Sequence, residues 1–358
     1  MRSPLSSSLR GLSAAVVATA ALLAHSAGGA TLPNLYVVTV SPDPTARDQR
    51  AAAIQAAMAR LLIRVTGNRN APLDPALRPM LSNADRYLAS YGLDLQRQPQ
   101  VGFLRSPVEQ ALTAVGMPVW GPERPLTLLW VAIDDGLGGR ALLGANDANH
   151  IEGVPSPAMT ASLKTLRTEL TAVADERGLP IELPLLDLED LGAVTFADIW
   201  GGFEDRVSAA SQRYRADAVL IGRVRPGIVG NEIQWLFLRG VERQVVLGGA
   251  LRDGLDAAAD AYAAETSTVG GVNATLISVR NVVSSADYGR VMSYLEQQSV
   301  LQSVDVESLE NGVLNLRVAA RGDARVLERI FSLGGVLRPA AATGGQPTFE
   351  IVRSGSGP

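Results

Sequence analysis

Two neighbouring acids, Asp134 and Asp135, are the residues whose type and position best suit chemistry in this sequence. They follow a nearly continuous apolar run, and carboxylates at the end of a buried strand converge on a cleft in α/β proteins. There they could act as general acid and base or bind a hard cation. His150 follows on the same segment, and a Ser–His–Asp arrangement needs only one histidine. Asp134, Asp135 and His150 are therefore the catalytic candidates to weigh.

The surrounding sequence favours a non-catalytic interpretation of these three residues. It has no Gly-x-Ser-x-Gly elbow, and Ser162 stands two residues before Lys164, not the three of a Ser-x-x-Lys motif. The chain has no cysteine, and the acids have no second pair at a ligand-like spacing, so we expect no metal site. The two acids can equally be polar turn residues that follow the strand, and His150 can be a solvated loop residue. We therefore predict no catalytic residue.

A Gly-x-Gly-x-x-Ala run, formed by Gly136, Gly138 and Ala141, superficially matches a dinucleotide fingerprint. The two acids before it would repel a pyrophosphate. The residues after Ala141 include Gly144 and do not have the pattern of a helix that receives phosphate. We therefore expect no cofactor and interpret Asp134–Pro155 as a long loop.

Trp120 and Arg124 are the candidate binding residues, because an irregular segment, Met117–Pro125, holds them between two regular blocks. Three prolines and a glycine keep that segment irregular. Trp120 either packs between the blocks and joins them, or forms part of an exposed contact surface.

Residues 1–30 have the composition of a secretory signal peptide. Two arginines precede an apolar stretch at residues 11–24, and small residues follow. That stretch is shorter than the roughly 20 residues of a membrane-spanning helix. We expect cleavage after Ala27 or Ala30, which also removes His25. Without cysteine, the chain can form no disulfide and carry no lipoprotein anchor.

The charge balance argues against several classes of partner. Removing residues 1–30 removes two arginines and no acid, which takes the net charge from −4 to −6. Such a chain does not favour nucleic acid or anionic lipid, which bind basic patches. No later stretch is long and apolar enough to span a bilayer. We expect a free periplasmic or secreted protein whose partners are envelope proteins.

The first predicted domain, residues 31–125, combines strands and helices. A strand at Leu35–Val40 precedes a helix at about Thr45–Val65, with Gly67 as its C-cap and a shorter helical segment at Pro75–Tyr91. The apolar residues of the long helix recur at helical spacing and predict one buried face. That face consists of Ile54, Ala57, Met58, Leu61, Leu62 and Val65.

The second predicted domain, residues 126–267, alternates strands and helices, which implies a mixed sheet flanked by helices. Leu126–Ile133 is nearly continuously apolar, as a strand buried on both faces should be. Helices are predicted at about Ser156–Arg177, Phe196–Tyr214 and Leu251–Glu265. Further strands are predicted at Ile181–Leu185, Ala218–Val224, Glu232–Leu238 and Arg243–Leu247.

The third predicted domain, residues 268–352, has the order strand, helix, strand, strand, helix, strand. This order is the ferredoxin-like split βαβ pattern. Asn311-Gly312 separates two alternating segments, Val304–Leu309 and Val313–Val318, and signals a two-residue hairpin. We expect residues 353–358 to form a disordered tail.

Short motifs spaced along the first two blocks carry a family resemblance. They are Arg-Val-Thr-Gly-Asn at 64–68, Ser-Asn-Ala-Asp-Arg-Tyr at 82–87, Pro-Val-Trp at 118–120, Arg-Pro at 124–125 and Leu-Trp-Val-Ala at 129–132. Together they resemble an exported bacterial family, domain of unknown function two thousand and sixty-six, over residues 31–265. The resemblance implies an envelope location and no assigned reaction.

A second resemblance lies in the middle block. Arg-Ala-Asp-Ala-Val-Leu-Ile-Gly-Arg-Val at 215–224 is similar to a strand of TolB-type N-terminal domains. Those α/β, anticodon-binding-like domains occur in periplasmic proteins that act by protein contacts. The expected fold class is therefore α+β and multi-domain, with a TolB N-terminal-like middle domain and a C-terminal ferredoxin-like βαββαβ domain.

Small domains in series without a reactive cluster favour a non-catalytic binding or assembly module of the cell envelope. One alternative is an envelope hydrolase with a carboxylate-based site near Asp134 and Asp135. Another is a small-ligand sensor with a cleft between the first two domains, gated by the long loop. Convergence of the two acids with His150 would favour the enzyme, whereas an exposed apolar patch or open sheet edge would favour the binding module.

Overall fold

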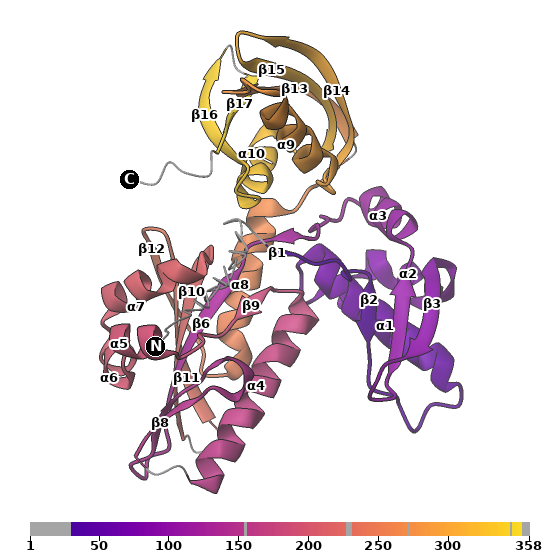
Figure 1. Cartoon of the computed structure of the whole chain (residues 1–358). Helices are drawn as coiled ribbons and strands as arrows, with labels where there is room; N and C mark the ends of the chain where they lie inside the picture. The colour runs from indigo at the N-terminus through magenta and orange to yellow at the C-terminus, as the bar shows by residue number, and fades with distance from the viewer. Residues whose placement is uncertain (1–29, 154–155, 227–230, 271, 344–345, 353–358) are drawn as a thin grey trace, which may run out of the picture.

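The computed structural model describes residues 30–153, 156–226, 231–270, 272–343 and 346–352. The predicted signal peptide, apart from Ala30, and the predicted tail lie outside the described residues. Three parts follow one another along the chain, and each has its own main β-sheet (Figure 1). The fold is α+β, as the sequence predicts.

The first part packs helix α1 (Gln49–Thr66) on a three-stranded antiparallel sheet of order β2-β4-β3. Helix α1 begins after Asp48, whose carboxylate accepts a hydrogen bond from the Ala51 N–H, and ends at Gly67, where φ is 68°. All six residues of the predicted apolar face are buried, so the helix, its face and its C-cap are confirmed. The strands are β2 (Val37–Thr39), β3 (Leu88–Leu93) and β4 (Pro99–Phe103), and a further helix is α3 (Arg105–Ala114).

Two segments of this part differ from the prediction. The helical segment predicted at Pro75–Tyr91 breaks into short helices and ends in β3, whose backbone groups pair with β4. The short helices are η1 (Ala71–Leu73), η2 (Pro75–Leu77), α2 (Arg78–Ser82) and η3 (Ala84–Tyr87). The irregular segment Met117–Pro125 contains strand β5 (Glu123–Arg124), which pairs with β1 (Ala30–Thr31). Strand β3 pairs with β4 across a short turn, whereas β5 pairs with a strand more than 90 residues earlier, and helical periodicity shows neither pairing.

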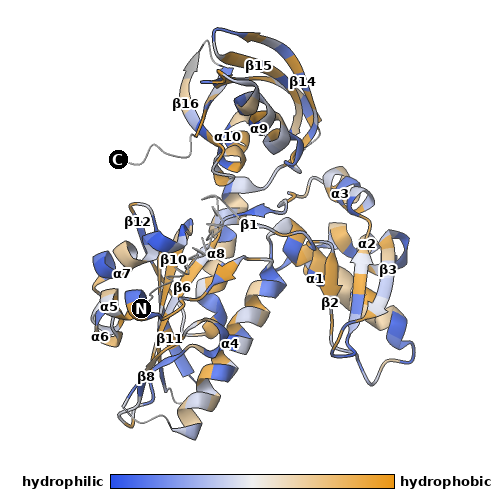
Figure 2. Ribbon diagram, viewed as in Figure 1, coloured by the Kyte–Doolittle hydropathy of each residue, from blue (hydrophilic) through white to orange (hydrophobic). Residues whose placement is uncertain are grey.

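The second part is built on a seven-stranded mixed sheet of order β12-β11-β10-β6-β7-β8, with β9 also paired to β6. The central strand β6 (Thr127–Asp134) runs parallel to β10 (Ala218–Pro226). Alternate β6 side chains join two separate cores, one with helices α4 and α8 and one with α5, α6 and α7. Burial on both faces explains its continuous apolar run, which Figure 2 shows as an orange strand.

The remaining elements of this part mostly follow the predicted order. They are β9 (Ile181–Glu182), β11 (Asn231–Arg239), β12 (Glu242–Val246), α4 (Pro157–Arg177), α5 (Leu188–Ala193), α6 (Phe196–Gly201), α7 (Glu204–Ser211), η5 (Gln212–Tyr214) and α8 (Leu251–Thr266). The single helix predicted at Phe196–Tyr214 was wrong, because Gly202 has a φ of 80° and ends α6. The loop predicted at Asp134–Pro155 was also wrong. It contains β7 (Arg140–Leu142), η4 (Ala145–Asp147) and β8 (His150–Glu152), which extend the sheet.

The third part has a five-stranded sheet of order β14-β15-β13-β17-β16 with two helices. Asn311 and Gly312 both have positive φ, 50° and 76°, which confirms the two-residue hairpin. The predicted order lacks one strand, because β17 follows β16 and inserts between β13 and β16. The elements are β13 (Val272–Arg280), α9 (Ser285–Glu296), β14 (Leu301–Glu310), β15 (Val313–Arg321), α10 (Ala324–Leu333), β16 (Leu337–Thr343) and β17 (Gln346–Ile351).

Each buried core draws its residues from one continuous stretch of the chain, and Trp120 of the segment Met117–Pro125 belongs to the core of the second part. The cores fall within residues 35–119, 120–263 and 277–351. The predicted domain boundaries at 31–125, 126–267 and 268–352 stay a prediction. Among the described residues, no helix is long and apolar enough to cross a membrane.

Candidate functional site

The carboxylates of Asp134 and Asp135 organise the turn between β6 and β7. Oδ1 of Asp134 accepts a hydrogen bond from the Gly136 N–H at 2.9 Å. Oδ1 of Asp135 accepts from the N–H groups of Leu137 and Gly139, each at 2.8 Å. Both acids therefore have the local hydrogen bonds of turn residues.

His150 begins strand β8 and lies opposite Leu142 of β7. Within the part of the chain that the structure describes, no hydrogen bond or ion pair joins it to Asp134 or Asp135, so the three candidates are not assembled into a catalytic group. Asp134 instead faces Arg140, with 3.6 Å between Oδ2 and Nε. No group of three histidine or acidic residues suited to a metal ion occurs among the described residues.

The glycine run resembling a dinucleotide fingerprint forms the hairpin turn. Gly136 and Gly138 have φ values of 71° and 97°, and strand β7 follows them directly. A pyrophosphate site at such a run needs a helix N-terminus after the turn. The described residues have a strand there instead.

Trp120 is fully buried between the first two parts of the molecule. Its backbone N–H donates to the carbonyl oxygen of Val65 at 2.7 Å. The guanidinium carbon of Arg124 lies 3.7 Å from the centre of the indole ring. Of the two alternatives open from the sequence, the structure therefore shows Trp120 packed between blocks and not exposed on a contact surface.

Arg124 is also fully buried, and its hydrogen bonds go to backbone carbonyl oxygens. Nη1 donates to Gly178 at 2.6 Å and to Arg177 at 3.1 Å, while Nη2 donates to Arg64 at 2.7 Å. These carbonyls lie at the C-terminal ends of α4 and α1, where the helix dipole places partial negative charge. Burial, together with the neighbouring charge of Arg64, lowers the pKa of Arg124 well below its ordinary value.

Two more buried arginines complete this contact. Nη2 of Arg177 donates to the carbonyl oxygen of Gly67 at 2.9 Å, and its Nη1 donates to Asp256 at 2.9 Å. Arg64 donates to both the carbonyl oxygen and the carboxylate of Asp175, at 2.9 and 2.8 Å. We call Arg64, Arg124 and Arg177 the arginine junction. It fixes α1 of the first part against α4 of the second.

Only part of the arginine junction has a signal in the sequence. Arg64 lies in the last turn of its predicted helix, where a cation suits the helix dipole. Arg177 has the same position at the end of the next long predicted helix, before Gly178. The partners are far apart in the chain, so nothing local shows that each arginine also satisfies the other helix. Arg124 was predicted as a binding residue, and the structure places its side chain inside the molecule.

A buried acid joins the first part to the third. Glu109 on α3 accepts hydrogen bonds from Tyr36 at 2.7 Å and Arg105 at 2.9 Å, and it pairs with Arg321 of β15. Burial by itself raises the pKa of Glu109, but the hydrogen bonds from Tyr36 and Arg105 bring it below its ordinary value. The same burial and the Glu109 charge raise the pKa of Tyr36.

Strand β12 is an open edge of the seven-stranded sheet. It lies at the end of the strand order and pairs with β11 on one side. Val245 is 57% exposed, and Leu247 just after the strand is 90% exposed. Beside them lies a groove of about 370 Å³. Its lining includes Arg223, Leu236, Arg243, Val245 and Leu247.

Comparison with known proteins gives one match. Residues 29–121 match a family described as "Domain of unknown function (DUF8605)". The match agrees with a domain of unknown function in the first part, although the resemblance drawn from the motifs named another family and extended to residue 265. No curated protein and no solved structure matches the chain.

Proposed function

We propose that this protein is a non-catalytic binding or assembly module of the cell envelope, and that β12 is the edge that receives its partner. The observation that carries the proposal is the exposed apolar edge at Val245 and Leu247. The partner class is an envelope protein with an extended apolar segment.

An edge strand offers unpaired backbone N–H and C=O groups, and proteins commonly protect such edges with charge or cover. On β12 the apolar residues are Val245 and Val246, which follow three polar residues, and Leu236 of β11 lines the adjoining groove. Backbone pairing would supply affinity, and the groove would select the side chains of the added strand. This is the open sheet edge expected of a binding module.

The two alternatives have less support. In a carboxylate hydrolase, Asp134 and Asp135 would face a substrate, yet both accept hydrogen bonds from their own turn. A sensor cleft between the first two parts would be gated by the segment at 134–155. The groove of about 360 Å³ at that boundary has no lining residue from this segment.

The proposal also covers the types of the second and third domains, export of the chain and its family relationship. The parallel pair β6 and β10, with helices on both faces, supports a TolB N-terminal-like middle domain. The third part supports a ferredoxin-like domain carrying one inserted strand. The signal-peptide composition of residues 1–30 supports export, and the motifs at 64–132 support kinship with the exported family they resemble.

Affinity capture from envelope extracts tests the edge directly. We expect the wild-type chain to retain a partner that the double variant Val245→Lys, Leu247→Lys loses, because lysines on an edge strand oppose strand addition. Val241→Lys is the matched control, since Val241 is fully exposed in the β11–β12 turn and outside the groove. Equal capture by all three proteins, or no partner of the wild type, would refute the proposal.

A further inference from the structure

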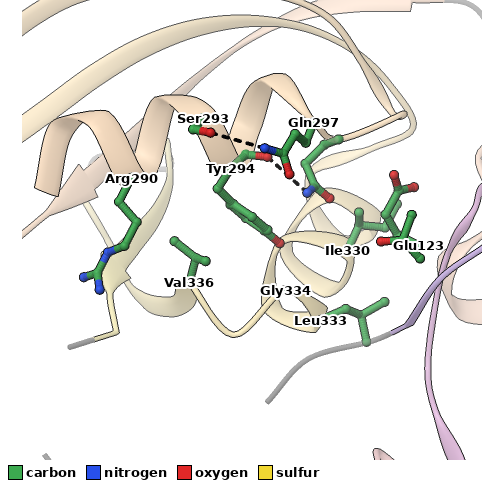
Figure 3. A pocket seen from close by; sticks show the side chains of 11 residues that line it. Glu123, Arg290, Ser293, Tyr294, Gln297, Ile330, Leu333, Gly334 and Val336 are labelled. Carbon is green, nitrogen blue, oxygen red and sulfur yellow. Dashed lines mark hydrogen bonds between the residues drawn. The ribbon is translucent and has the colours of Figure 1, made fainter. Parts of the chain in front are cut away.

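A larger groove, of about 630 Å³, lies in the third part between its two helices and the β1–β5 ribbon (Figure 3). One wall comes from α9 and the residues that follow it, and the other comes from α10 and the turn after it. Glu123 of β5 lies at one end. The lining residues that matter here are Glu123, Arg290, Tyr294, Gln298, Leu333, Gly334 and Val336.

Gln298 contributes a buried acceptor without a partner. The residue is 7% exposed, and its Nε2 donates to the carbonyl oxygen of Tyr294 at 3.2 Å. Within the described part of the chain, nothing donates to its Oε1. Buried polar atoms are nearly always hydrogen-bonded, so an atom left unpaired in a groove lining indicates a missing donor.

Glu123 adds a second acceptor at the same end. Its Oε1 accepts from the Ser299 N–H at 3.0 Å, and its Oε2 accepts from the Ser299 hydroxyl at 2.5 Å. An ionised carboxylate has about four acceptor positions, so Glu123 retains room for a further donor. A cationic group with several N–H donors matches this pair, whereas an anion would be repelled by Glu123.

The opposite end of the groove has donors. Figure 3 shows Arg290 far from Glu123, with Tyr294 and Val336 between them. Nη2 of Arg290 donates to the carbonyl oxygen of Val352 at 3.1 Å and lies 3.9 Å from Oδ1 of Asp287, and the Arg290 side chain is 38% exposed. A guanidinium has five N–H donors, so Arg290 can bind a carboxylate while keeping this bond.

The spacing of the two ends sets the ligand length. Arg290 and Gln298 are eight residues apart, which is roughly 12 Å at the rise of a helix. An extended peptide covers about 3.3–3.6 Å per residue, so a single amino acid is too short and about three residues fit.

The middle of the groove is apolar. Leu333 and Val336 are half-buried along one wall. The Tyr294 ring packs over Gly334, where an added Cβ would come within 2.0 Å of a ring carbon. The glycine therefore makes room for the ring, and the apolar wall of Leu333 and Val336 suits small or aliphatic side chains.

We propose that this groove binds a short zwitterionic peptide of about three residues, with its α-ammonium at Gln298 and Glu123 and its α-carboxylate at Arg290. The site is separate from the β12 edge and does not depend on it.

Calorimetric titration of the purified protein with Ala-Leu-Ala tests the assignment. We expect a dissociation constant of about a millimolar or lower. N-acetylation and C-amidation of the peptide should each weaken binding by about tenfold, because each removes one charged end.

Variants assign the two ends. Arg290→Gln should weaken the free peptide by about tenfold and leave the C-amidated peptide unchanged. Gln298→Met keeps the side-chain length and removes the acceptor, so it should weaken the free peptide and spare the N-acetylated one. Arg325→Gln, an exposed change of the same charge on α10 and outside the groove, is the matched control and should bind like wild type.

The proposal fails if the free peptide gives no binding heat at millimolar concentration. It also fails if both blocked peptides bind as well as the free one, or if Arg290→Gln behaves like Arg325→Gln. Because Arg290 is partly exposed, its variant gives a readout even if Gln298→Met does not fold.

Discussion

Nη2 of Arg177 donates to the carbonyl oxygen of Gly67 at 2.9 Å, so the last residue of α4 satisfies the capped end of α1. The end of a helix leaves carbonyl groups without partners inside that helix. Here a residue from another part of the molecule supplies the donor. Arg124 also donates to carbonyl oxygens at the ends of both helices. Buried hydrogen bonds therefore hold the first two parts of the molecule together.

Replacing Arg124 by methionine is expected to lower the free energy of unfolding by about 3 kcal/mol or more. The carbonyl oxygens of Arg64 and Gly178 would lose their donor in a buried site. Arg124→Lys should recover only part of the loss, because an ammonium cannot reproduce the guanidinium fork. Urea unfolding measures the effect, with exposed Arg325→Met as control. A loss for Arg124→Met within about 0.5 kcal/mol of the control would contradict the role assigned to the junction.

The close approach at Gly67 makes a second prediction. Gly67 has a φ of 68°, and an added Cβ would lie 2.2 Å from the Cβ of Ala263. Gly116 has a similar φ of 72° with open space around it. Gly116→Ala should therefore cost about 1 kcal/mol of backbone strain, and Gly67→Ala clearly more.

A double variant separates strain from crowding at this position. Ala263→Gly removes the clashing atom. In that background, Gly67→Ala should lower the free energy of unfolding by an amount closer to that for Gly116→Ala. Thermal unfolding of the single and double variants provides the comparison. Equal losses for Gly67→Ala and Gly116→Ala would mean that packing against α8 does not restrict this position.

Local patterns were sufficient where burial and turn chemistry decide the structure. The spacing of Ile54, Met58 and Leu61 predicts the buried face of α1, since helical periodicity places them on one side. Asn311-Gly312 predicts its hairpin because both positions require positive φ. These features depend on neighbouring residues and on nothing distant.

Patterns failed where pairing between strands decides the structure. Arg140–Leu142 is too short and too close to glycines to read as a strand, yet it pairs with β6. Strand β17 lies between two earlier elements, and the sequence carries no local sign of that insertion. The candidate site shows the same limit, because the partners of Arg124 and the groove around Gln298 each come from widely separated segments.

The bonds of Glu109 predict a pH dependence of stability. Its pKa is lowered in the folded chain, despite burial, by hydrogen bonds from Tyr36 and Arg105. A lowered folded-state pKa means that the ionised group stabilises the fold above its unfolded pKa. That stabilisation is lost as the pH falls through the folded-state value. Glu109→Gln should therefore be less stable than wild type near neutral pH, by about 2 kcal/mol.

The difference between wild type and Glu109→Gln should narrow as the pH falls below 4.5, the ordinary value for a glutamate. Urea unfolding at several pH values between about 7 and 3 measures it. Glu296→Gln, an exposed change at the end of α9, is the control and should show no such trend. If the difference in unfolding free energy stays constant with pH, the ionised carboxylate of Glu109 does not stabilise the contact between the first and third parts.

Pairing of Ala30 makes a prediction about processing. Ala30 lies opposite Arg124 and Thr31 opposite Glu123 in the β1–β5 ribbon. Cleavage after Ala30 would remove one of the two β1 residues, whereas cleavage after Ala27 keeps both. If the chain is exported as proposed, we expect the mature protein to begin at Gly28, which intact mass measurement of the purified mature protein determines. Ala27→Leu, which replaces the small residue before the cleaved bond, should reduce processing, and Ala30→Leu should leave it unchanged. A mature chain beginning at Thr31 would show that the ribbon does not need Ala30.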